Sequence, residues 1–96
     1  PLYEGVLMAT ATRTVHIEDP VGIHARPASA FTQAVAASGC SVTISKQPGT
    51  PGVAAASVLM VMSLGVQQHD TIEIVVEGDD AEAVADGLVK TLLASE

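Results

Sequence analysis

The chain has 96 residues, of which 48% are apolar, although only Tyr3 and Phe31 are aromatic. Four basic residues stand against eleven acidic ones, which gives a formal charge of -7. This length allows one small domain with an aliphatic core, while the acidic charge and the shortage of rings argue against binding to nucleic acid or to anionic membrane surfaces.

The N-terminal part of the chain divides into a segment without pattern and a strand. Residues 1–11 are expected to be a poorly ordered extension, in which Met8 is a candidate native start. Residues 12–18 alternate between polar and apolar side chains, which predicts a half-buried strand with His16 on its solvent side. The folded domain is therefore expected to span residues 12–96.

A turn and a helix follow this strand. Residues 19–22 (DPVG) are typical of a type I turn, with Asp first, Pro second and Gly last. Pro27 suits the first turn of a helix, because its missing N–H would have no partner there. Apolar spacing then continues to Ser38, and Gly39 suits the end of a helix. The pattern predicts a helix over residues 27–38.

His24 lies between this turn and this helix, at a place that favours anions. The first N–H groups of a helix have no partner within it, and its dipole is positive at that end. Arg26 can hold phosphate oxygens with two parallel hydrogen bonds. Because an imidazole is mostly neutral near pH 7, one ring nitrogen is available as a nucleophile. The stretch indicates a phosphoryl-accepting histidine, and on this pattern alone an ordinary exposed histidine remains the alternative.

The middle of the chain reads as two strands joined by a loop. Residues 41–46 alternate like a half-buried strand. Residues 47–52 contain two Pro and two Gly, which indicates a loop. Residues 53–55 are expected to form a short strand.

A short helix is predicted over residues 57–64, with Ser57 as its N-cap and Gly65 as its stop. Apolar residues occupy every face of this helix, and a two-turn helix at the surface cannot bury all of its faces. We therefore expect an exposed apolar patch containing Met and Leu, of a kind that binds protein partners. A fully enclosed helix is the alternative.

The sequence pattern of the C-terminal part predicts a strand over residues 71–77, followed by a last helix. Asp79 and Glu82 have the spacing of a capping box for that helix. Its expected buried stripe consists of Val84, Leu88 and Leu92 together with Ala81 and Ala85. The order strand, helix, strand, strand, helix, strand, helix is typical of the two-layer α+β class.

The remaining candidate groups point to no metal and no cofactor. Cys40 has no partner for an internal disulfide, and we expect it to be a small packed residue. A metal site is not predicted, because no short-interval spacing of a metal motif links Cys40 with His16, His24 and His69. No apolar run approaches the roughly 20 residues of a membrane span, and no signal-peptide pattern is seen. With a single cysteine as well, we expect a cytoplasmic protein.

Two stretches carry a resemblance to a known family, residues 22–28 (GIHARPA) and residues 56–65 (ASVLMVMSLG). In this order and at this distance they resemble HPr, the histidine-containing phosphocarrier proteins of the bacterial phosphoenolpyruvate-dependent sugar phosphotransferase system. The likeness covers about residues 12–93. It implies an open-faced β-sandwich, in which three helices cover one face of a four-stranded antiparallel sheet in the order βαββαβα.

The resemblance also implies roles for particular residues. His24 would accept a phosphoryl group on Nδ1 from phospho-enzyme I and pass it to sugar-specific IIA components, so the protein would be a carrier and not an enzyme. Arg26 would contact the phosphate. Ser57 would stand where a regulatory serine kinase phosphorylates some members of the family. The partner-docking surface would include Ala25, Leu59 and Met62.

The chain departs from many relatives on this docking surface. Places where they carry Lys or Arg are occupied here by Gln33, Ala36, Ala56 and Met60, so docking is expected to be more apolar and less steered by charge. The alternative function is a regulatory protein-binding module, switched by phosphorylation of Ser57. On either reading, we expect a monomer.

Overall fold

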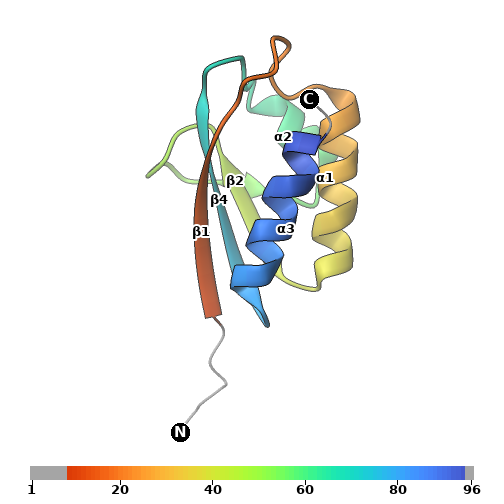
Figure 1. Cartoon of the computed structure of the whole chain (residues 1–96), viewed down its shortest axis with the longest axis vertical. Coiled ribbons are helices and arrows are strands. Elements are labelled where there is room, and N and C mark those ends of the chain that lie inside the picture. Colours follow the sequence, from red (N-terminus) through yellow and green to blue (C-terminus); the bar gives the residue numbers. More distant parts are fainter. Residues whose placement is uncertain (1–8, 95–96) are drawn as a thin grey trace, which may run out of the picture.

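The computed structural model describes residues 9–94, in which one antiparallel sheet is covered on one face by three helices (Figure 1). The sheet has the order β1-β4-β2-β3, and every neighbouring pair is antiparallel. Its strands are β1 (Ala9–His16), β2 (Ser41–Ser45), β3 (Val53–Ala54) and β4 (Thr71–Gly78). The helices are α1 (Ala25–Ser38), α2 (Val58–Ser63) and α3 (Ala81–Ala94). The predicted α+β class and the order βαββαβα are confirmed.

The core lies between the sheet and the helices and is aliphatic around a single ring. Along β4 every second side chain is fully buried, because successive residues of a strand point to opposite faces. Phe31 of α1 is also fully buried. After Phe31, the largest fully buried side chains are Ile17, Ile44, Ile72, Ile74, Leu92, Val61 and Val76. This agrees with the core that the composition predicted.

Strand β1 begins three residues earlier than predicted. Residues 9–11 pair with β4 down to Gly78, and Ala11 is buried, so these residues belong to the sheet and not to an extension. The rest of the predicted extension, including Met8, lies outside the described residues. The strand ends at His16, and the remaining boundaries lie within about two residues of the predicted ones.

Helix α2 begins as predicted, with Ser57 as its N-cap. The hydroxyl oxygen of Ser57 accepts a hydrogen bond from the backbone N–H of Met60 at 3.2 Å. Of the α2 side chains, Val61 is buried while Leu59 is 78% exposed. The expected exposed apolar patch is therefore confirmed, and the alternative of a fully enclosed helix is wrong.

The predicted capping box of α3 is wrong. The carbonyl of Asp80, one residue later than predicted, accepts the first helical hydrogen bond, from the N–H of Val84 at 2.9 Å. Glu82 instead accepts a hydrogen bond from the guanidinium of Arg13 at 2.6 Å, and Asp86 accepts another at 2.9 Å. The hydrogen bonds that Arg13 donates, to Asp86 first and then to Glu82, raise the pKa of Arg13, and together they connect β1 to α3. Within residues 9–94 no helix is long and apolar enough to cross a membrane.

Candidate functional site

The loop before α1 is held in place by a turn and by the backbone of the next loop. The N–H of Gly22 donates to the carbonyl of Asp19 at 2.9 Å, which confirms the predicted turn. Ile23 is buried, and its N–H donates to the carbonyl of Val66 at 3.2 Å. The segment that leads into His24 is therefore anchored to the loop between α2 and β4.

His24 is the N-cap of α1. Its backbone is extended (φ -111°, ψ -174°), and its carbonyl accepts the N–H of Ala28 at 3.0 Å. The side chain makes no capping hydrogen bond. Within residues 9–94 the N–H groups of Ala25 and Arg26 have no acceptor, and Pro27 has none to offer. The imidazole, which is 37% exposed, thus stands at a helix start whose free donors favour an anion.

The carboxylate of Asp19 lies beside the ring of His24. One carboxylate oxygen, Oδ2, lies 3.5 Å from Nε2, an ion-pair distance that is longer than a good hydrogen bond. The other, Oδ1, accepts the N–H of Val21 at 2.8 Å, which fixes the carboxylate. Nδ1 has no hydrogen-bond partner among the described residues. From the sequence, Asp19 is predicted only as the first residue of the turn, and its contact with His24 is not predicted.

Arg26 lies at the same helix start, two residues after His24, and is exposed. Its side chain makes no hydrogen bond or ion pair within residues 9–94. The guanidinium is therefore available to an anion, while its predicted contact with phosphate stays a prediction.

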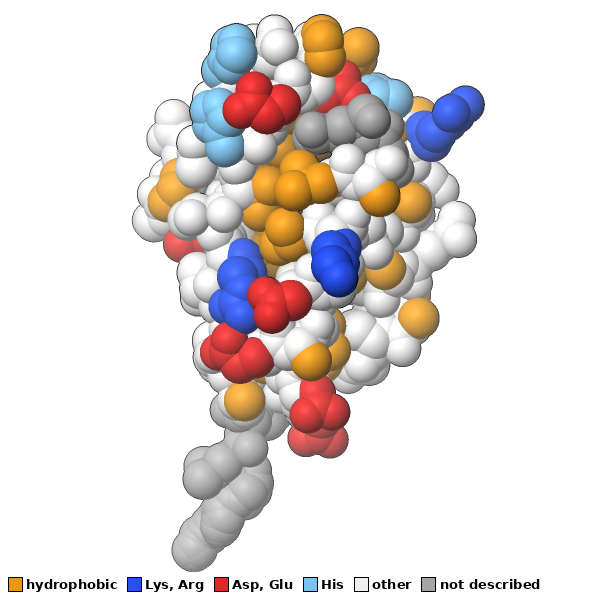
Figure 2. All heavy atoms as spheres, viewed as in Figure 1, with side chains coloured by type: hydrophobic (Ala, Val, Ile, Leu, Met, Phe, Trp, Pro, Cys, Tyr) orange, Lys and Arg blue, Asp and Glu red, His pale blue; other side chains and the backbone are white. Residues whose placement is uncertain are grey.

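Exposed apolar side chains lie near this helix start. Leu59 is 78% and Met62 39% exposed on α2, which packs against α1, and Ala25 is exposed too. Val21, in the loop before α1, is 66% exposed. Hydrophobic and histidine side chains occupy the same end of the molecule in Figure 2. The arrangement suits contact with a protein surface.

The other candidates are separated from His24. Cys40 is half-buried, and its Sγ contacts the carbonyl of Asp79 at 3.4 Å, as expected for a packed residue. His16 and His69 come together with Glu18, and this group includes neither His24 nor Cys40. The four residues weighed for a metal site therefore do not form one cluster.

Three comparisons with known proteins agree with one another. The family model described as "PTS HPr component phosphorylation site" matches residues 11–94. The chain is 44% identical over 80 residues to "Phosphocarrier protein HPr" of Streptomyces coelicolor, covering 83% of this chain and 85% of that protein.

Two solved structures are also similar to the chain, both from Thermoanaerobacter tengcongensis. The crystal structure of HPr-C-His has a TM-score of 0.76 and 31% identity, and covers 88% of this chain and 92% of that one. A second crystal structure, titled as an HPr dimer, has a TM-score of 0.64 and 31% identity, and covers 84% of this chain and 91% of that one.

Proposed function

Since this chain belongs to the HPr family of phosphocarrier proteins of the phosphotransferase system, we propose that His24 carries the phosphoryl group. Proteins of this family are carriers and not enzymes. The observation that supports the assignment is the position of His24, half-exposed at the N-cap of a helix with free N–H donors and with Nδ1 unengaged.

The proposed step forms one bond and breaks one. The lone pair of Nδ1 attacks the phosphorus, and the bond to the donor breaks with its electron pair staying on the donor. The proton on Nε2 remains, so the phosphorylated ring carries a positive charge that the Asp19 carboxylate stabilises across 3.5 Å. The N–H groups of Ala25 and Arg26 and the guanidinium of Arg26 face the developing phosphate charge. Reversal of the same step passes the group on.

We further propose that the donor is phospho-enzyme I and the acceptors are sugar-specific IIA components. Docking would use the exposed apolar residues around the helix start, namely Ala25, Leu59 and Met62. Positions 33, 36, 56 and 60, which carry no charge, are all exposed. Association with partners should therefore depend weakly on ionic strength. We propose that the working form is a monomer, which analytical ultracentrifugation over a range of protein concentrations measures.

The direct test is phosphorylation of the purified chain. Incubation with phosphoenolpyruvate and enzyme I should add one phosphate that is labile in acid and stable in alkali, and peptide mapping should locate it on His24. A subsequent addition of a IIA component should remove it. Failure to label with enzyme I from several phosphotransferase systems, or a label on another residue, would contradict the proposal.

Asp19→Asn should slow phosphoryl uptake by about three- to tenfold while leaving the fold intact. The asparagine keeps an oxygen that accepts from the N–H of Val21, but it removes the negative charge beside Nε2. Initial rates at several ionic strengths measure the effect, and circular dichroism checks the fold. An unchanged rate would show that the carboxylate serves only the turn.

A second proposed role concerns Ser57, whose hydroxyl starts the exposed helix α2. Its oxygen accepts from the N–H of Met60, so a phosphate there would also lie at a helix N-terminus and need not unfold the helix. It would add negative charge to the docking surface. We propose that a serine kinase, where one is present, regulates the carrier at this position.

The pair Ser57→Asp and Ser57→Asn separates charge from capping, since both residues are good N-caps. Ser57→Asp should lower the rate of phosphorylation by enzyme I several-fold relative to Ser57→Asn, and salt should reduce the difference. The two variants should unfold at similar temperatures. Equal rates for both would argue against regulation by charge at this site.

A further inference from the structure

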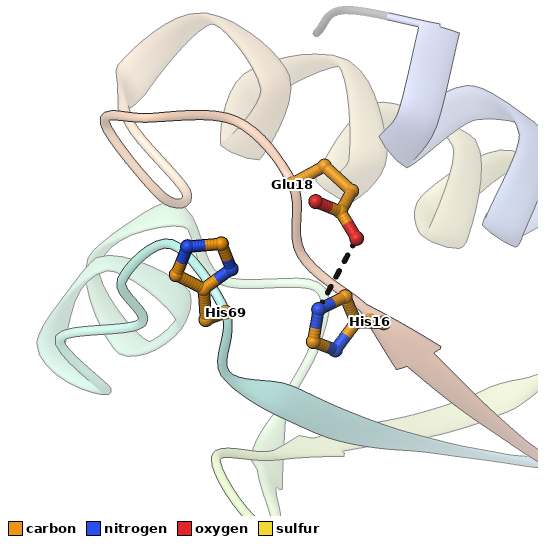
Figure 3. Close-up of side chains that lie close together, drawn as sticks. All are labelled: His16, Glu18 and His69. Atoms are coloured by element: carbon orange, nitrogen blue, oxygen red, sulfur yellow. Dashed lines mark ion pairs between the residues drawn. The ribbon is translucent and has the colours of Figure 1, made fainter.

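Two histidines and a glutamate lie together at the end of β1 (Figure 3), in a group that does not include His24. One ligand atom from each of His16, Glu18 and His69 lies within 4.8 Å of the others, and all three residues are exposed. Strand pairing brings them together. His16 pairs with Thr71, and beyond the strand end the N–H of His69 still donates to the carbonyl of Ile17 at 2.7 Å. This contact holds His69 beside the end of β1, against Ile17, the residue between His16 and Glu18.

One of the three distances between ligand atoms is that of a metal site. Metal–ligand bonds of about 2.0–2.1 Å in tetrahedral geometry leave ligand atoms roughly 3.3 Å apart. Nε2 of His16 lies 3.1 Å from Oε2 of Glu18, which matches such an edge. The ring centroids of His16 and His69 are 6.0 Å apart with the planes tilted by 33°. A ring nitrogen of His69 supplies the third ligand atom, within 4.8 Å of the other two.

A hydrogen bond on the far side of the ring prepares His16 for this role. Nδ1 of His16 lies 3.3 Å from the hydroxyl oxygen of Thr71. When the proton sits on Nδ1 and is donated to Thr71, the lone pair of Nε2 faces the carboxylate of Glu18. Two acceptors then point at each other, and a cation between them removes the repulsion. Metal-binding histidines are commonly oriented by such a hydrogen bond through their other nitrogen.

We propose that His16, Glu18 and His69 bind a divalent transition-metal ion of the Zn²⁺ class. Two imidazoles and one carboxylate suit zinc and its neighbours, whereas Mg²⁺ and Ca²⁺ prefer oxygen ligands alone. The exposed site leaves at least one coordination position to water, so micromolar affinity is expected. The bound ion would link the end of β1 to the loop before β4. The proposal is independent of phosphoryl transfer through His24.

Calorimetric titration of the full chain with zinc chloride, in a buffer that does not chelate metals, tests the site. One ion should bind per chain with a dissociation constant of about 1–50 μM, and Mg²⁺ should not compete. His16→Ala and His69→Ala should each weaken binding at least tenfold, and Glu18→Gln by a smaller factor. His24→Gln is the matched control, because it removes a histidine that also has a carboxylate nearby, and its affinity should equal that of the parent chain.

A second measurement reports on the fold as well as on binding. Zinc at about a hundred times the dissociation constant should raise the unfolding temperature of the parent chain by on the order of 10 °C, and should raise that of His69→Ala by no more than about half as much. No binding up to about 1 mM zinc, or equal affinity in the parent chain and in His16→Ala and His69→Ala, would overturn the proposal.

Discussion

Replacing His24 by alanine is expected to abolish phosphoryl uptake from enzyme I while leaving the fold in place. The proposed reaction needs an unprotonated ring nitrogen as nucleophile, and no other imidazole lies at a helix start among the described residues. The substitution should lower the stability of the fold only slightly, because the side chain of His24 makes no capping hydrogen bond and is 37% exposed. We expect the free energy of unfolding to change by less than about 1 kcal/mol.

The experiment compares three histidine variants under the same labelling conditions. His24→Ala should take up no acid-labile phosphate, whereas His16→Ala and His69→Ala should be labelled at close to the parent rate. Thermal unfolding of each variant shows whether a loss of label reflects a loss of fold. A large drop in the unfolding temperature of His24→Ala would mean that His24 is a structural residue.

The secondary structure and the position of His24 could be predicted because both depend on local sequence. Alternating side chains set the strands, and Pro27 and Gly39 lie inside the first turn and just past the end of α1. The capping box of α3 failed for a tertiary reason. Glu82 has the right spacing from Asp79, but its carboxylate binds Arg13 on a strand far away in the sequence. A local motif is then overruled by a longer-range contact.

The contacts around the two histidine sites could not be predicted, because they depend on the path of loops and on strand register. Asp19 meets His24 because the turn brings its carboxylate to 3.5 Å from Nε2. His69 meets His16 because the first and last strands are neighbours in the sheet. In the sequence His16 and His69 lie far apart. The antiparallel pairing of β1 with β4, which ends at His16 and Thr71, is the knowledge that would have brought His69 close to His16.

Gly22→Ala is expected to be strongly destabilising, because this glycine combines a positive φ with a close backbone approach. Its φ is +80°, in a region that residues with a Cβ adopt at a cost. A Cβ at this position would lie 2.1 Å from the carbonyl oxygen of Val66 and 2.7 Å from the Cα of Gln67. Both are backbone atoms, so the clash cannot be relieved by moving one flexible side chain. The expected loss is about 2–4 kcal/mol of unfolding free energy.

Gly39→Ala is the matched control for this variant. Gly39 has a similar φ of +72°, but a Cβ there would meet nothing within 4 Å. Gly39→Ala should therefore lose only the free energy of unfolding that a Cβ costs at a positive φ, roughly 1 kcal/mol. The difference in stability between the two variants then measures the close approach of Gly22 to Val66. Gly22→Ala should unfold at least about 10 °C below the parent chain. Below that temperature it should also accept phosphate more slowly, because relief of the clash moves the backbone that leads directly into His24. If the two glycine variants are equally stable, the loop before α1 is not held against the loop after α2 as the structure describes.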